Sequence, residues 1–114
     1  MPPTVEDRLS DIRASISQIE RITSNMTLER FASDITIRAA TERFLEIVCE
    51  ASRRLLANDI KQREPQIAWR KMVDFGNLLR HAYQSTKTEF VRDMVKNDLP
   101  TLKAFVERSI QTSK

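Results

Sequence analysis

The residue types best suited to chemistry gather between positions 70 and 84, on one side of an expected helix. At about 100° per residue, five polar side chains fall within a sector of roughly 80°: Arg70, Asp74, Asn77, His81 and Gln84. His81 is the only histidine of the chain. Because imidazole groups titrate near neutral pH, His81 is the residue best suited to exchange a proton with a substrate.

Two neighbours of His81 favour phosphate chemistry. Asn77, one turn earlier, can donate and accept hydrogen bonds, and Arg80 can neutralise a phosphate. Gly76 is the only glycine and stands in mid-helix, where it costs about 1 kcal/mol relative to alanine, so something other than helix propensity placed it there. Tyr83, two turns later, could be a core or rim residue. The alternative for the whole polar side is ordinary solvent-facing surface.

Charge is distributed unevenly along the chain. The net charge of +3 divides into about −3 for residues 1–52, +5 for residues 53–87 and +1 for residues 88–114. An anion such as RNA would bind the middle segment, although many clusters of this size are only solvated helix faces.

Several classes of protein are not supported. The single cysteine, Cys49, cannot form an internal disulfide and has no Cys or His near it at metal-ligand spacing, so we expect it to be a small apolar helix residue. No metal or cofactor is expected. No signal peptide or run of roughly 20 apolar residues is found, so we expect a cytoplasmic protein without membrane contact.

Composition and periodicity predict one all-α domain over residues 1–114. Only one glycine is present, and helix formers are abundant. The first helix should span residues 5–23, with a core seam of Val5, Leu9, Ile12, Ile16 and Ile19. Thr27 should cap a short helical turn. The second helix should begin near Ser33 or Asp34 and end near Leu56, burying Ala40, Phe44, Ile47, Val48, Ala51 and Leu55.

A polar connection over residues 58–65 should precede the third helix at residues 66–84, which would bury Ala68, Met72, Phe75, Leu79 and Ala82. Thr86 and Glu89 match a reciprocal capping pattern, so a fourth helix should start beside them with Phe90, Val91, Met94 and Val95 as its core face. Pro100 should separate it from a fifth helix ending near Ile110.

Residues 75–83, Phe-Gly-Asn-Leu-Leu-Arg-His-Ala-Tyr, resemble the signature of the HepT-like toxins of the HEPN superfamily. That signature is an arginine, a polar residue, three further positions and then histidine-any-tyrosine. The likeness covers most of the chain, since further matching segments occur in the family's order: residues 11–12, 27–31, 47–51, 69 and 98–103.

The resemblance implies an antiparallel four- to five-helix up-and-down bundle that forms a homodimer, with the motifs of both subunits facing one groove. It implies a metal-independent endoribonuclease acting on RNA, as the toxin of a type VII toxin–antitoxin system. His81 would be the acid–base residue and Asn77 would support it, with Arg80 or Arg70 binding RNA. The partner would be a nucleotidyltransferase-type antitoxin, which in some systems modifies the motif tyrosine, here Tyr83, with AMP.

The chain departs from this pattern at Gly76, where the family has arginine. Because a phosphate-binding arginine commonly contributes orders of magnitude in rate, the alternative is a degenerate, weak or inactive member that acts through its partner. Arg80 is a possible substitute, although it points roughly 80–100° away from His81 around the helix. Cys49 also stands where many relatives have glycine. A third possibility is an adaptor bundle whose polar stripe is solvent surface.

Overall fold

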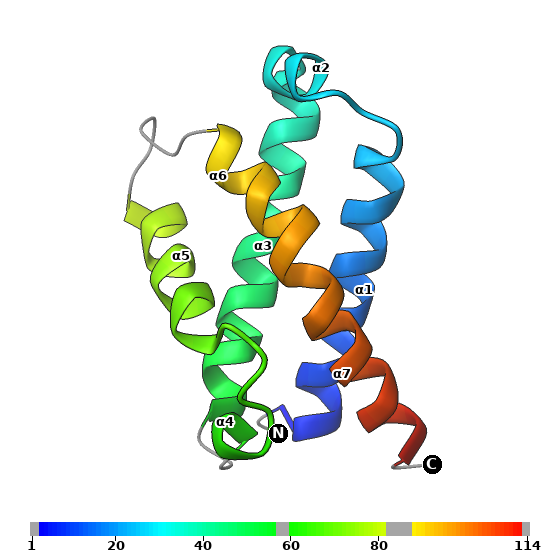
Figure 1. Ribbon diagram of the computed structural model, residues 1–114, viewed down its shortest axis with the longest axis vertical. Helices are drawn as coiled ribbons and strands as arrows, with labels where there is room; N and C mark the ends of the chain where they lie inside the picture. The colour runs from blue at the N-terminus through cyan, green and yellow to red at the C-terminus, as the bar shows by residue number, and fades with distance from the viewer. Residues whose placement is uncertain (1–2, 57–59, 82–87, 113–114) are drawn as a thin grey trace.

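The structure, a computed structural model, describes residues 3–56, 60–81 and 88–112. The long helices run alternately up and down the molecule, so that α1 and α5 ascend while α3 and the α6–α7 segment descend (Figure 1). Within these ranges every regular element is helical, which confirms the predicted all-α, HEPN-like bundle. None of the helices in the described ranges is long and apolar enough to cross a bilayer.

Side-chain caps determine where the first three helices begin. Helix α1, Val5–Thr23, starts at a capping box in which the Asp7 amide donates to Thr4 Oγ1 at 3.1 Å and the Thr4 amide donates to Asp7 Oδ2 at 2.9 Å. Thr27 caps α2, Leu28–Ser33, as predicted. Asp34 both ends α2 and caps α3, Ile35–Leu55, which decides between the two expected starting residues.

The connection between α3 and α5 differs from the prediction. A short helix, α4 (Ile60–Arg63), occupies part of the expected polar loop, and α5 spans Trp69–His81, three residues later than predicted. The carbonyl of Glu64 accepts hydrogen bonds from the amide of Ile67 at 3.3 Å and from the indole N–H of Trp69 at 3.0 Å. Because these bonds close a turn, the regular hydrogen bonding of α5 begins only at Trp69. Residues 82–84, predicted to continue the helix, lie outside the described ranges.

Pro100 does not separate two helices as predicted. Helix α6 (Thr88–Asp93) continues through the π-helical turn η2 (Met94–Asp98) into α7 (Leu99–Thr112). In that turn the amide of Leu99 donates to the carbonyl of Met94, five residues earlier. Because proline lacks an N–H and crowds the carbonyl four residues before it, the wider turn accommodates Pro100 without a break. Thr86, the predicted cap, lies outside the described residues.

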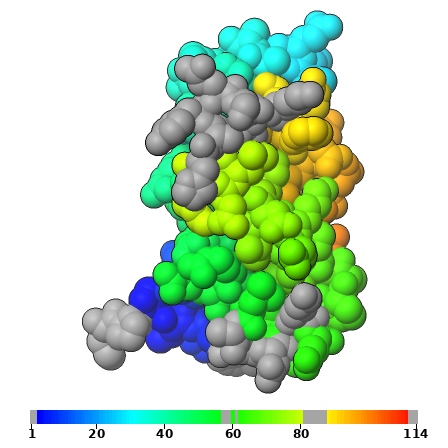
Figure 2. Space-filling view, turned by 90° about the vertical axis from the view of Figure 1, so that its left-hand side faces the viewer, coloured from blue at the N-terminus to red at the C-terminus, as the bar shows by residue number. Residues whose placement is uncertain are grey.

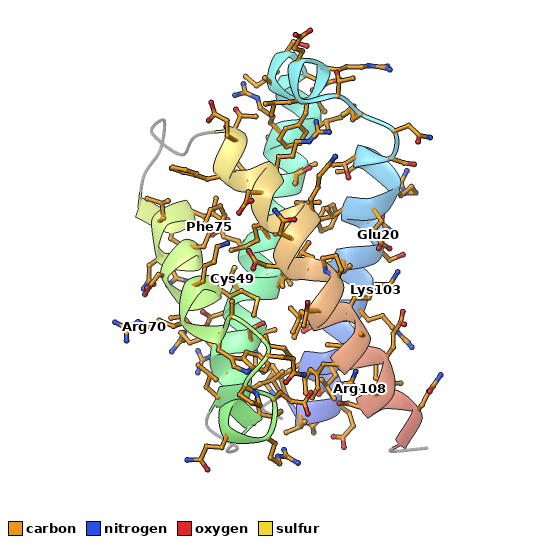
Figure 3. The ribbon with its side chains drawn as sticks, in the orientation of Figure 1. Glu20, Cys49, Arg70, Phe75, Lys103 and Arg108 are labelled. Carbon is orange, nitrogen blue, oxygen red and sulfur yellow. The ribbon has the colours of Figure 1, made fainter. Side chains whose placement is uncertain are left out.

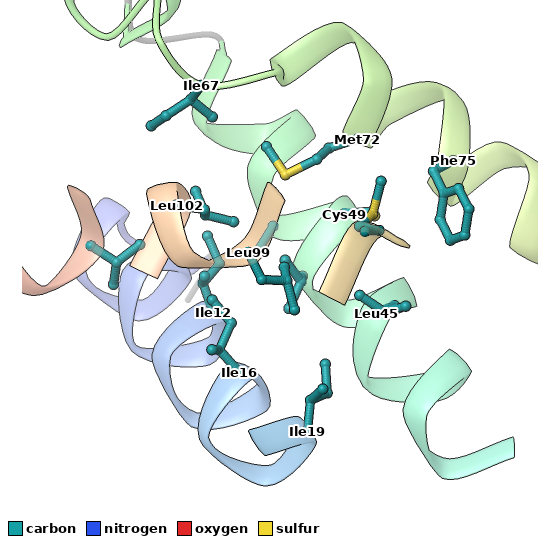
Figure 4. Packing of buried hydrophobic residues seen from close by; sticks show 14 of the residues in the cluster. Ile12, Ile16, Ile19, Leu45, Cys49, Ile67, Met72, Phe75, Leu99 and Leu102 are labelled. Atoms are coloured by element: carbon teal, nitrogen blue, oxygen red, sulfur yellow. The ribbon is translucent and has the colours of Figure 1, made fainter. Parts of the chain in front are cut away.

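The core fills the space between α1, α3, α5 and α7 (Figure 4). Leu9, Ile12, Ile16 and Ile19 of the predicted α1 seam are buried, whereas Val5 is 37% exposed because it is the first residue of the helix. On α3 the predicted core residues Val48, Ala51 and Leu55 are buried. The predicted Ala40, Phe44 and Ile47 are only half-buried, and the residues that follow or flank them are buried instead: Thr41, Leu45, Cys49 and Ser52. Periodicity had identified the helix but not its exact rotation.

Two further core predictions are wrong. Ala68 is exposed because it precedes the first turn of α5, and Phe90 is 55% exposed although it belongs to α6. Trp69, the first residue of α5, packs edge-to-face on Phe105 of α7, with the ring centroids 5.9 Å apart, and so joins these two helices. At the periphery, Lys103 Nζ lies 3.0 Å from Glu20 Oε2 and links α7 to α1 (Figure 3).

Candidate functional site

The helix that carries the candidate motif lies against α3, and Gly76 determines how closely the two helices approach. Gly76 is buried in α5, and a Cβ added to it would lie 2.7 Å from Cys49 Cβ on α3. Non-bonded carbon atoms do not approach so closely, so only glycine permits this contact. The cost of glycine in a helix is thus offset by close helix–helix packing. The two departures from the family pattern noted above, at positions 49 and 76, touch one another.

Cys49 is buried on the apolar side of this contact, among Leu45, Met72 and Phe75 (Figure 4). This confirms the expectation of a small apolar helix residue. Burial raises the pKa of the Cys49 thiol to about 12, and the nearby positive charge of Arg80 offsets only part of that effect. A thiol in this environment is a poor nucleophile, so we assign it no chemical role.

We expect Cys49 to resist alkylation in the native protein. Iodoacetamide reacts with thiolates, and both burial and the raised pKa keep this group protonated at pH 8. Mass spectrometry should find little modification in buffer after an hour and complete modification in guanidinium chloride. Equal labelling rates in the two conditions would contradict the packing of α5 on α3.

On the polar side of the same helix contact, three side chains form a hydrogen-bonded cluster. Arg80 Nη2 donates to Asn77 Oδ1 within α5, and Arg80 Nη1 donates to Glu50 Oε2 on α3 at 3.3 Å. About one third of the side-chain surface of Arg80 and of Glu50 is exposed, at 34% and 33%. The cluster is therefore open to a ligand on one side while the helices hold it on the other.

Glu50 is the centre of this cluster. Its carboxylate accepts two hydrogen bonds from Arg53, at 2.7 and 3.1 Å, and one from Arg54 at 3.0 Å. These donors, Arg53 foremost, lower the pKa of Glu50 to about 2 against the opposing effect of burial. Because the pKa of Glu50 is lower in the folded state, its ionised carboxylate stabilises the fold at pH values above the ordinary pKa near 4. This contribution is lost as the pH falls toward 2. The carboxylate thus stays ionised at every pH at which the protein would work.

Beside this cluster, a hollow of about 480 Å³ opens between α1, α3 and α5. Its charged lining consists of four arginines and three carboxylates: Arg8, Arg43, Arg53, Arg80, Asp11, Glu46 and Glu50. Guanidinium groups bind phosphates through several N–H donors at once, so a hollow with this lining suits a polyanion better than a neutral ligand.

The structure describes some of the predicted site residues in full and others only in part or not at all. Asn77 is exposed on α5, and Arg80 bonds to it. His81 is the last residue of α5 and directly follows Arg80, but its side chain lies outside the described part of the structure, as does the whole of Tyr83. The structure therefore brings together Asn77 and Arg80 and places the backbone of His81 beside them.

Arg70 does not join this group. It projects from the first turn of α5 (Figure 3), where its Nε lies 3.5 Å from Asp74 Oδ2. It lines a different and more apolar hollow of about 790 Å³, together with Ile67, Phe75 and Leu78. Eleven residues of helix, roughly 16 Å along the axis, separate Arg70 from His81. Figure 2 shows this face of the molecule, with α5 in yellow-green across its middle.

Sequence reasoning missed Glu50 and the arginines of α1 and α3. The spacing of Glu50 from Arg53 and Arg54, three and four residues, was visible in the sequence and is typical of helix-surface ion pairs. The hydrogen bond from Arg80 to Glu50 joins residues thirty positions apart, so no local sequence pattern predicts it. Among the residues that the structure describes, no group of three or more His, Cys, Asp or Glu side chains could hold a metal ion.

The fold and the hollow define the class: an all-helical protein of HEPN-like architecture that carries an amide, a guanidinium and a histidine within about one turn of one helix. The chain belongs to the HepT-like family, whose model, described as Ribonuclease HepT-like, matches residues 12–109.

Curated relatives agree with this assignment. The chain is 37% identical over 103 residues to Probable ribonuclease HepT of Thermococcus cleftensis, covering 90% of this chain and 93% of that protein. It is 34% identical over 99 residues to Putative RNase MJ1380 of Methanocaldococcus jannaschii, covering 87% and 90% respectively. No solved structure matches the chain significantly.

Proposed function

We propose that this protein is a metal-independent endoribonuclease, the toxin of a cytoplasmic toxin–antitoxin system. The match to the HepT-like ribonuclease family over residues 12–109 carries the proposal. The arginine-lined hollow beside Asn77 and Arg80 supports it, because a nuclease must bind the phosphate that it cleaves.

In the proposed reaction the nucleophile comes from the RNA. The 2′-hydroxyl attacks the adjacent phosphorus, the bond to the 5′-oxygen of the next nucleotide breaks, and the products carry a 2′,3′-cyclic phosphate and a 5′-hydroxyl. His81 takes the proton from the 2′-hydroxyl or supplies one to the leaving oxygen. Arg80, held by Asn77 and Glu50, stabilises charge on the phosphate. Solvent water exchanges the other proton, so that both proton transfers are accounted for.

A homodimer would place two such motifs in one groove. Leu78, directly after Asn77, is 39% exposed and lines the apolar hollow on the outer face of α5. Contact with a second copy would remove this apolar surface from water. A small nucleotidyltransferase is the proposed antitoxin, and Tyr83 the proposed acceptor of its AMP.

The proposal is tested by incubating the purified full chain with a mixed-sequence RNA in the presence of EDTA. We expect fragments that end in 2′,3′-cyclic phosphate, and expression of the chain alone should arrest growth. Co-expression with a nucleotidyltransferase of the antitoxin type should restore growth and add the mass of one AMP to the peptide that contains Tyr83. RNA that stays intact at stoichiometric protein would contradict ribonuclease activity.

The second candidate is a degenerate family member that binds its partner but does not cleave RNA. Gly76 favours it, because the close contact with Cys49 leaves no room for an arginine at this position. Under this alternative the chain binds the nucleotidyltransferase while RNA stays intact. A purely adaptor role predicts instead that simultaneous changes at Asn77, His81 and Tyr83 alter neither RNA binding nor partner binding.

A further inference from the structure

Three guanidinium groups from two helices converge on the single carboxylate of Glu50. Arg53 and Arg54 reach it from the next turn of α3, and Arg80 reaches it from α5. Glu50 and these three arginines together carry three positive charges and one negative charge, so the group is cationic. Exposed ion pairs contribute about 0–1 kcal/mol to stability, so the requirement for a stable fold does not by itself explain this convergence.

The bonds restrict the guanidinium of Arg80 to one orientation. One terminal nitrogen is held by Glu50 and the other by Asn77, so both ends of the group are fixed. A guanidinium has five N–H donors, and the remaining ones are available to an anion. An arginine fixed before binding loses less conformational entropy when it binds a phosphate.

We infer that Glu50 is a positioning residue for the RNA phosphate. It holds Arg80 and Arg53 at the hollow between α1, α3 and α5, so that Arg80 supplies the guanidinium that position 76 lacks. This inference rests on the proposed ribonuclease function. It predicts that removing a negative charge weakens the binding of a polyanion, the opposite of the simple electrostatic expectation.

The test compares Glu50→Gln with Glu42→Gln in the full chain. Glu42 lies two turns earlier on α3 and outside the hollow, so its substitution removes the same charge without disturbing the arginine cluster. Binding is measured with an RNA oligonucleotide whose 2′-hydroxyls are replaced by hydrogen, and cleavage is measured with the natural RNA. We expect Glu50→Gln to weaken binding about tenfold and Glu42→Gln to leave it unchanged or slightly stronger.

A double-mutant cycle with Arg80→Ala isolates the positioning role. Because Glu50 holds Arg53 as well as Arg80, Glu50→Gln should still weaken binding in the Arg80→Ala background, but by a smaller factor than in the unsubstituted chain. Tighter binding by Glu50→Gln would overturn the inference, since the carboxylate would then be competing with phosphate for the arginines. Equal effects of Glu50→Gln and Glu42→Gln would overturn it too. If the unsubstituted chain neither binds nor cleaves RNA, the proposed function itself fails.

Discussion

Replacing Gly76 with alanine should destabilise the protein, although alanine is the better helix former by about 1 kcal/mol. The new Cβ would lie 2.7 Å from Cys49 Cβ, an atom bonded directly to the α3 backbone that no side-chain rotation can move away. Helices α3 and α5 would have to separate, and such overpacking typically costs 1–3 kcal/mol. After the gain of about 1 kcal/mol in helix propensity is subtracted, we expect a net loss of up to about 2 kcal/mol in the free energy of unfolding, measured by urea denaturation.

The same substitution should have the opposite sign in a Cys49→Gly background. Removing the Cβ at position 49 removes the atom with which the new methyl group would clash, so alanine at position 76 then contributes only its better helix propensity. The four proteins form a cycle whose coupling energy should exceed about 1 kcal/mol. Additive effects would show that the two positions are not in contact.

This contact also changes how the missing arginine should be restored. Gly76→Arg alone tests activity in a protein whose helices have been forced apart. In the paired variant, Cys49→Gly with Gly76→Arg, the Cβ of residue 49 is absent, so the Cβ of an arginine at position 76 has room. If the chain is a degenerate ribonuclease, cleavage should rise in the paired variant and much less in the single one.

Replacing His81 with alanine should abolish most RNA cleavage. General acid–base catalysis by a positioned side chain typically contributes 10²–10⁴-fold, so the single-turnover rate should fall by about that factor. The affinity for the 2′-deoxy oligonucleotide should change much less, because the arginines of the hollow remain in place. The rate is followed by gel electrophoresis of an end-labelled RNA.

Gln111→Ala, at an exposed position near the end of α7, is the matched control and should cleave at the unsubstituted rate. Thermal unfolding of His81→Ala distinguishes loss of chemistry from loss of fold. A His81→Ala protein that is folded and fully active would exclude the proposed catalytic role and shift the site to other residues.

The amino-acid sequence by itself determined the long helices α1 and α3 and the family. Apolar residues at alternating spacings of three and four predicted α1 and most of α3, and Thr27 and Asp34 capped helices where their side-chain chemistry predicted. The run over residues 75–83 pointed to the HepT-like family that the comparisons show. These features are local, because helix periodicity and capping depend on residues within a few positions of one another.

Only the tertiary structure decided how the helices are rotated and how closely they pack. The contact of Gly76 with Cys49 and the bond of Arg80 to Glu50 join positions about thirty residues apart, so neither leaves a local pattern. The same holds for the exposure of Phe90, which helix periodicity placed in the core. Helix–helix register depends on the shapes of both surfaces at once, and a pattern along a single helix contains only half of that information.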